Sequence, residues 1–110
     1  MATAETNFES HKKEEEAKYR HREDLEFRVL ARRNKLLGLW AAEQMGYPPE
    51  SAEAYAKEVV TCALGAPDHA HDKVNEELAA KGVDVADSRV RDEMTRLEDV
   101  AREQVIKETT

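Results

Sequence analysis

The chain has 110 residues, which suits one domain; 40% of them are hydrophobic, 37% are charged, and the mean hydropathy is -0.80. No apolar run approaches the length of a membrane span, and the single Cys62 excludes an internal disulfide. The net charge of -7 comes from residues 47–110, because residues 1–46 hold nine basic and nine acidic side chains. This composition disfavours nucleic acid as a partner, and it predicts a cytoplasmic protein without membrane insertion or a secretory signal.

Residues 1–18 form a charged segment with few side chains to bury, chiefly Met1 and Phe8. Such a segment cannot offset the entropy of ordering by itself. It does contain Glu-to-basic pairs at helical spacing, Glu14 with Lys18 and Glu16 with Arg20. We therefore predict a flexible N-terminal arm over residues 1–18 that is competent to form a helix when it binds a partner.

The next segment, residues 19–45, predicts the main helix. One face carries apolar or small residues at helical spacing: Phe27, Leu30, Ala31, Asn34, Leu37, Gly38, Ala41 and Met45. The opposite side carries Leu25, Val29, Leu36 and Trp40. Residues 36–42 are thus apolar nearly all round, which predicts that they lie at the centre of a bundle. Gly46 and the two prolines after it predict the end of this helix.

Three further helices are predicted at about residues 50–64, 68–81 and 86–107, with Gly65 and Gly82 ending the first two. Each has an apolar face, and the last one has the regular spacing of a helix–helix seam. The expected inward residues are Ala52, Tyr55, Ala56, Val59, Val60 and Ala63, then Ala70, Val74 and Leu78, then Val90, Met94, Leu97, Ala101 and Val105. The predicted fold is all-α: a four-helix bundle over residues 19–110 with a mobile N-terminal arm.

Residues with catalytic or metal-binding chemistry are scattered. Cys62 has no basic neighbour to activate it, so a buried or half-buried thiol is the favoured interpretation. His69 and His71 point in different directions on a helix, which favours a solvated helix start over a metal site. We expect no enzyme activity, no metal and no cofactor.

A basic cluster, Arg28, Arg32, Arg33 and Lys35, allows two interpretations. It could bind the phosphates of a nucleotide, or it could form salt bridges with Glu23, Asp24 and Glu26 of the same helix. The second interpretation is favoured. Gly38 lies within the helix at a cost of about 1 kcal/mol relative to alanine, which indicates the close approach of another helix.

The string ARRNKLLGLWAAE, residues 31–43, closely resembles the zeta subunit family of the alphaproteobacterial F-type ATP synthase. The likeness extends backward through EAKYRHREDLEFRVLARRN and forward through AEAYAKEVV, so it covers residues 16–60 well. From residue 65 onward it lies in helix pattern and length. The family motif falls on Arg32, Arg33, Asn34, Leu37, Gly38 and Trp40.

This resemblance implies a four-helix bundle and a regulatory function. It implies that the protein binds the catalytic head of the ATP synthase, formed by the catalytic subunits with the rotor stalk, and blocks ATP hydrolysis. The arm would become helical and wedge against the rotor while the bundle stays outside. The arm residues expected to contact the partner are Phe8, Lys12, Lys13, Glu14, Glu16, Lys18, Tyr19 and Arg20.

The arm departs from the family pattern at Glu15, where an aromatic residue is typical, and at Arg22, where an acid is typical. Both departures fall in the inhibitory element, so a weak inhibitor is an open alternative. Two other functions also stay open: a nucleotide-binding module that uses the basic cluster, and an assembly or interaction protein without inhibitory activity. A monomer is favoured.

Overall fold

The computed structural model describes the backbone of residues 2–109 and the side chains of residues 12–109. This part of the chain forms four helices and no strand: α1 (Ala2–Gln44), α2 (Pro49–Cys62), α3 (Asp68–Ala80) and α4 (Asp87–Thr109). The predicted all-α fold is confirmed, and the three later helices lie within two residues of their expected bounds. None of the described helices combines the length and apolarity needed to cross a membrane.

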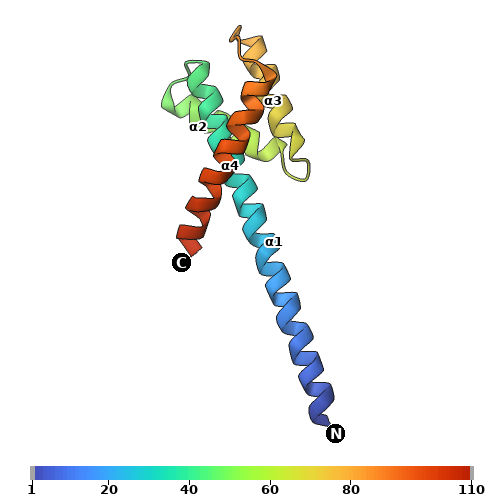
Figure 1. The fold of residues 1–110 in the computed structure, drawn as a ribbon. Coiled ribbons are helices and arrows are strands. Elements are labelled where there is room, and N and C mark those ends of the chain that lie inside the picture. Colours follow the sequence, from blue (N-terminus) through green and yellow to red (C-terminus); the bar gives the residue numbers. More distant parts are fainter. Residues whose placement is uncertain (1, 110) are drawn as a thin grey trace.

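Helix α1 is the axis of the molecule. It packs against α2 along one side and α4 along another, and α3 closes the bundle by touching all three other helices (Figure 1). The α1 side chains of Leu37, Ala41 and Ala42 are completely buried, and they form the main core with Tyr55 and Val59 of α2. The prediction that residues 36–42 form the centre of the bundle is confirmed.

Close contact between α1 and α2 depends on Gly38. A β-carbon at this position would lie 2.7 Å from the Cα atom of Ala56 and 3.3 Å from Cγ2 of Val59. Only a residue without a side chain allows the two backbones to approach so closely. The glycine within the helix therefore serves helix–helix packing, as the sequence indicates.

Helix α4 adds a second, smaller core on the opposite side of α1. Val29 of α1 is fully buried there against Ala101 and Val105, with Leu25 and Leu36 covering its edges. Four residues of the predicted α4 seam are buried: Val90, Leu97, Ala101 and Val105. The fifth, Met94, is half-buried. Arg102 fastens this contact by donating hydrogen bonds to Glu26, at 2.5 and 3.0 Å.

Two expectations about burial are wrong. Phe27 is 61% exposed, because α2 and the turn after it do not cover this part of α1. His71 is buried rather than solvated, and its Nε2 lies 2.7 Å from the Asp87 carboxylate at the start of α4. Glu93 is also buried, where Arg96 satisfies its carboxylate at 2.9 Å.

The whole molecule is elongated. Its principal extents are 72 × 24 × 20 Å and its radius of gyration is 19.0 Å, against about 13 Å for a compact domain of this length. The difference arises from α1, whose 43 residues span about 65 Å at about 1.5 Å per residue. The bundle thus occupies one end, and the first half of α1 projects from it (Figure 1).

Candidate partner-binding surface

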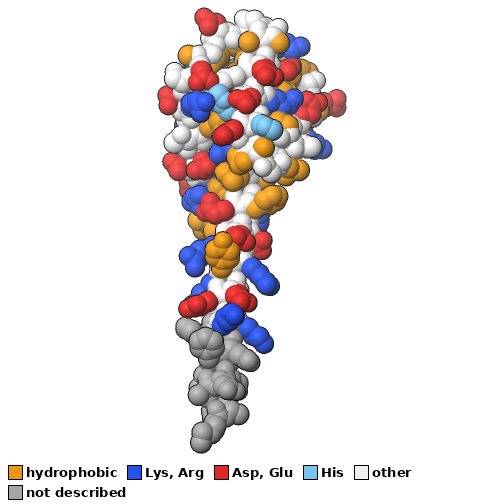
Figure 2. Space-filling model, turned by 90° about the vertical axis from the view of Figure 1, so that its right-hand side faces the viewer, with side chains coloured by type: hydrophobic (Ala, Val, Ile, Leu, Met, Phe, Trp, Pro, Cys, Tyr) orange, Lys and Arg blue, Asp and Glu red, His pale blue; other side chains and the backbone are white. Residues whose placement is uncertain are grey.

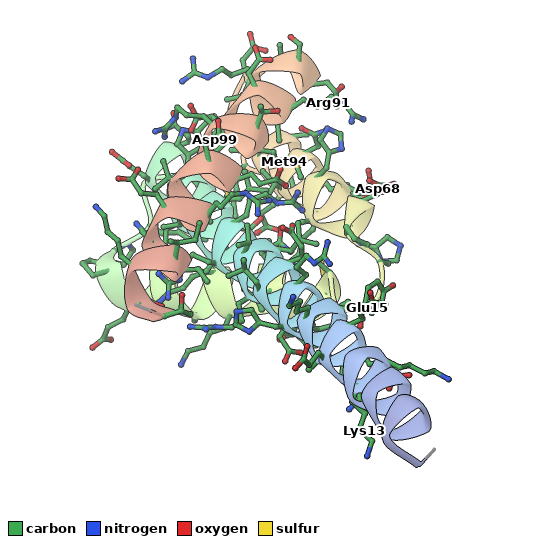
Figure 3. All side chains as sticks on the ribbon, turned by 60° about the horizontal axis from the view of Figure 1, so that its bottom comes forward. Lys13, Glu15, Asp68, Arg91, Met94 and Asp99 are labelled. Atoms are coloured by element: carbon green, nitrogen blue, oxygen red, sulfur yellow. The ribbon has the colours of Figure 1, made fainter. Side chains whose placement is uncertain are left out.

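The projecting part of α1 is the most exposed element of the described chain. Every residue from 12 to 24 is exposed, and Leu25 is the first that packs against another helix. Figure 2 shows side chains of both charges along this projecting part of α1. Figure 3 shows Lys13 and Glu15 on the same part of the helix. The predicted arm residues with described side chains therefore lie on a helix that is open to a partner.

The helix divides these arm residues among several sides. Lys12, Glu16, Tyr19 and Arg20 line one shallow hollow of about 370 Å³, together with Glu15. Successive residues of a helix differ by about 100°, so Glu14 and Lys18 fall on other sides of α1, while Lys13 lies beside Arg20 at the edge of this hollow. Phe8 lies outside the residues whose side chains the structure describes.

Tyr19 gives the arm an aromatic contact point. Its side chain is 61% exposed, although it is large and partly apolar. A hydrogen bond to Glu23 and the charge of that carboxylate raise the pKa of Tyr19 above its ordinary value, so the hydroxyl stays neutral at physiological pH. An exposed tyrosine among charged side chains is typical of a residue that becomes buried at a protein interface.

The basic cluster is paired mainly with α4. Arg33 donates to Glu98 at 3.1 Å and to the side-chain oxygen of Asn34, and both Arg33 and Asn34 are buried. Arg32 forms an ion pair with Glu108 at 2.8 Å, and Arg28 lies 3.6 Å from the same carboxylate. The three arginines are thus paired, and Lys35 is not paired among the described side chains. The expected partners were wrong, because the acids come from α4 and not from residues 23–26.

Three members of the basic cluster still share one hollow. Arg28, Arg32 and Lys35 line a space of about 590 Å³ between α1 and α2, to which α2 adds Lys57. Arg33 is not among its lining residues, because its guanidinium is turned toward Glu98 and Asn34. The structure therefore brings part of the predicted nucleotide-binding set together and separates Arg33 from it.

The family motif is structural in this chain. Leu37 is fully buried and Gly38 meets Ala56, as described above. Trp40 is half-buried, and the guanidinium of Arg89 lies 5.9 Å from the centre of its ring. The motif residues thus help to hold α2 and α4 against α1.

Sequence patterns missed one surface. Phe27 and Leu64, both more than half exposed, line a common groove of about 310 Å³ between α1 and the turn after α2. The apolar periodicity of α1 detected Phe27 but assigned it to the core. No sequence signal indicates where α2 stops covering α1 in space.

Comparison with known proteins gives one result. The family model described as ATPase inhibitor subunit zeta matches residues 5–104. Neither the curated proteins nor the solved structures gave a match. The matched range spans most of the exposed half of α1, the motif at Gly38 and most of α4. On this evidence the chain belongs to the ATPase inhibitor subunit zeta family.

Proposed function

We propose that this protein binds the catalytic head of an F-type ATP synthase and blocks ATP hydrolysis with its N-terminal arm. Membership of an ATPase inhibitor family supports an ATPase as the partner. The observation that carries the mechanism is the projection of α1 from the bundle as an exposed helix (Figure 1). As a regulatory protein, it needs no catalytic residues of its own.

In this mechanism the arm enters the head between the catalytic subunits and the rotor stalk. Residues 12–24 are exposed on every face of the helix. Such a helix suits an enclosed site, where it contacts protein on several sides at once. The bundle is wider than the helix and stays outside, so it limits how far the arm enters. The wedge obstructs rotation, and ATP hydrolysis stops because it is coupled to rotation.

An inhibition assay with full-length variants tests this proposal. Lys12→Ala/Glu16→Ala/Tyr19→Ala removes three contacts from the arm and keeps helix propensity high. We expect this variant to need at least about tenfold more protein for half-inhibition of the cognate ATPase, since interface tyrosines are frequent binding hot spots. Deletion of residues 1–18 should abolish inhibition.

The matched control lies on α4, where Asp92→Ala/Thr95→Ala/Asp99→Ala changes three exposed polar side chains. It should inhibit like the parent protein. Equal inhibition by the parent and the arm variant would exclude the arm as the inhibitory element. Binding to the synthase with no change in turnover would select an assembly protein instead.

Nucleotide binding is the second candidate function. The hollow that combines Arg28, Arg32, Lys35 and Lys57 with the Phe27 ring favours it, because cations suit phosphates and an aromatic ring suits a base. Titration with ATP should then shift the backbone resonances of Arg28 and Lys57 while leaving Lys81 unchanged. An unchanged spectrum would exclude this function.

A further inference from the structure

The groove between α1 and the turn after α2 has mostly apolar walls and two exposed large apolar side chains. Phe27 is 61% exposed and Leu64 is 57% exposed, and the two residues come from different elements that face the same hollow. Leu30, Val60 and Pro67 complete the walls. Figure 2 shows hydrophobic side chains gathered where the projecting part of α1 meets the bundle. A contiguous apolar surface of this kind marks a site of protein association.

The groove also has a polar contact in its wall. Asn34 is 95% buried, and its side-chain oxygen accepts hydrogen bonds from Arg33 at 3.1 and 3.2 Å. These bonds fix the orientation of the amide. Within the described part of the chain its nitrogen has no hydrogen-bond acceptor, so the groove offers one donor among apolar walls.

Positive charge continues the groove along α1 and α2. Phe27, Ala31 and Val60 line both this groove and the neighbouring hollow. That hollow has four basic side chains, Lys35 and Lys57 among them, against one acidic side chain, Glu53. Both lysines are exposed, and neither forms an ion pair within residues 12–109. An occupant that fills both hollows must therefore present apolar side chains at one end and carboxylates at the other.

The groove lies in line with the arm. Leu30 follows Tyr19 by eleven residues, which is three helical turns, so both residues lie on nearly the same side of α1 about 16 Å apart. A partner that holds Tyr19 can thus reach the groove without any bending of α1. The arm face and the groove thus lie on nearly the same side of α1.

We propose that this groove, lined by Phe27, Leu30, Val60, Leu64 and Pro67, is a second docking surface that takes an acidic amphipathic helix of the catalytic head. The inference rests on the proposed function and adds a partner element to it. The apolar face of that helix lies against Phe27 and Leu64, and its carboxylates meet Lys35 and Lys57. The groove contributes affinity, while the arm blocks rotation.

Affinity measurements with the isolated catalytic head test this proposal. Phe27→Ser/Leu64→Ser in the full chain should weaken binding by about 10- to 100-fold, because two large apolar anchors lose their burial. The matched control is Ile106→Ser, which changes an exposed apolar residue on α4 (44% exposed) and should bind like the parent. Saturating amounts of the groove variant should still inhibit hydrolysis, unlike the protein that lacks residues 1–18.

A charge variant keeps the test decisive if the groove variant fails to fold. Lys35→Glu/Lys57→Glu should weaken binding at least about tenfold at low salt and reduce its salt dependence, whereas Lys81→Glu should not. Unchanged affinity of both variants, with weakened binding by the arm variant, would overturn the groove and leave the arm mechanism intact. Failure of the parent protein to bind the head would reject the proposed function itself. A dimer of the parent that Phe27→Ser/Leu64→Ser dissociates would assign the groove to a second copy and overturn the inference.

Discussion

At Gly38 the packing of α1 and α2 opposes the intrinsic preference of the helix. Replacing a helical glycine by alanine normally stabilises a protein by about 1 kcal/mol. Here the new β-carbon would lie 2.7 Å from a backbone atom of Ala56, which cannot move without shifting α2. We expect Gly38→Ala to lower the free energy of unfolding by about 1–3 kcal/mol, as measured by urea denaturation.

A second substitution tests whether contact with Ala56 causes the loss of stability in Gly38→Ala. Ala56→Gly removes the side-chain β-carbon that would lie 3.2 Å from the new β-carbon at position 38, but it keeps the Cα atom at 2.7 Å. It should therefore rescue Gly38→Ala only in part. A Gly38→Ala variant as stable as the parent would contradict the close approach of the two helices.

The hydroxyl of Tyr55 lies in the core without a hydrogen-bond partner among the described residues. Burial raises the pKa of Tyr55 well above its ordinary value of 10.0, because ionisation would place a charge in apolar surroundings. The unfolded chain therefore loses this proton at a lower pH than the folded chain does. As a result, the free energy of unfolding decreases as the pH rises above about 10.

Replacing this residue gives a prediction for neutral and alkaline solution. Tyr55→Phe should raise the free energy of unfolding at pH 7 by about 1 kcal/mol, because it removes an unsatisfied buried hydroxyl. Its stability should also fall less steeply than that of the parent as the pH rises above about 10. Tyr47→Phe is the contrasting control, since the Tyr47 hydroxyl donates to Glu77 at 3.0 Å and its loss should destabilise. A destabilised Tyr55→Phe variant would contradict the prediction.

At the scale of the helices, ion pairs fasten α4 to α1. Arg102 holds the pKa of Glu26 below its ordinary value of 4.5 by donating hydrogen bonds to the carboxylate. Since the folded pKa is lowered, the contribution of this pair is complete above the unfolded pKa and is lost as the pH falls through the folded one. Arg96 lowers the pKa of Glu93 in the same way.

These pKa shifts predict an acid-dependent stability. Thermal unfolding should be insensitive to pH between about 5 and 7, and the protein should lose stability as the pH falls below about 4.5. Glu26→Gln should cost at most about 1 kcal/mol at pH 7, because the pair is exposed, and should make the acid loss shallower. The same acid profile in the parent and the variant would show that Glu26 does not contribute to it.

The elements also show what a sequence can predict. The helix bounds could be predicted from the sequence because Gly46, Gly65 and the prolines end helices through local backbone geometry. The helix–helix seams could be predicted because apolar residues at helical spacing indicate one buried face. The partners of Arg32 and Arg33 could not be predicted, since the acids that bind them are 65 to 76 residues away in the sequence. The exposure of Phe27 was missed for a related reason: it depends on where α2 ends relative to α1.

At the scale of the whole molecule, the sequence predicted an N-terminal arm, but not its arrangement as a continuous extension of α1. Charge composition identifies residues 1–18 as unable to form a core, and family likeness implies their role. That the arm continues α1 without a break follows only from the structure (Figure 1). This continuity aligns Tyr19 with the groove, so the bundle sets the direction of the arm.

The same continuity predicts a gradient of stability along α1. The helix is already nucleated in the bundle, but residues 12–24 have no other helix to pack against, and isolated helical segments are marginal in water. We expect their amide hydrogens to exchange at least about a hundredfold faster than those of residues 34–42, which should exchange only on global unfolding. Native-state hydrogen exchange by NMR measures both sets in one sample. Binding of the catalytic head should slow exchange in residues 12–24, because this exposed segment gains a partner. Uniform protection along α1 in the free protein would contradict the gradient and would mean that the arm is already rigid before it binds.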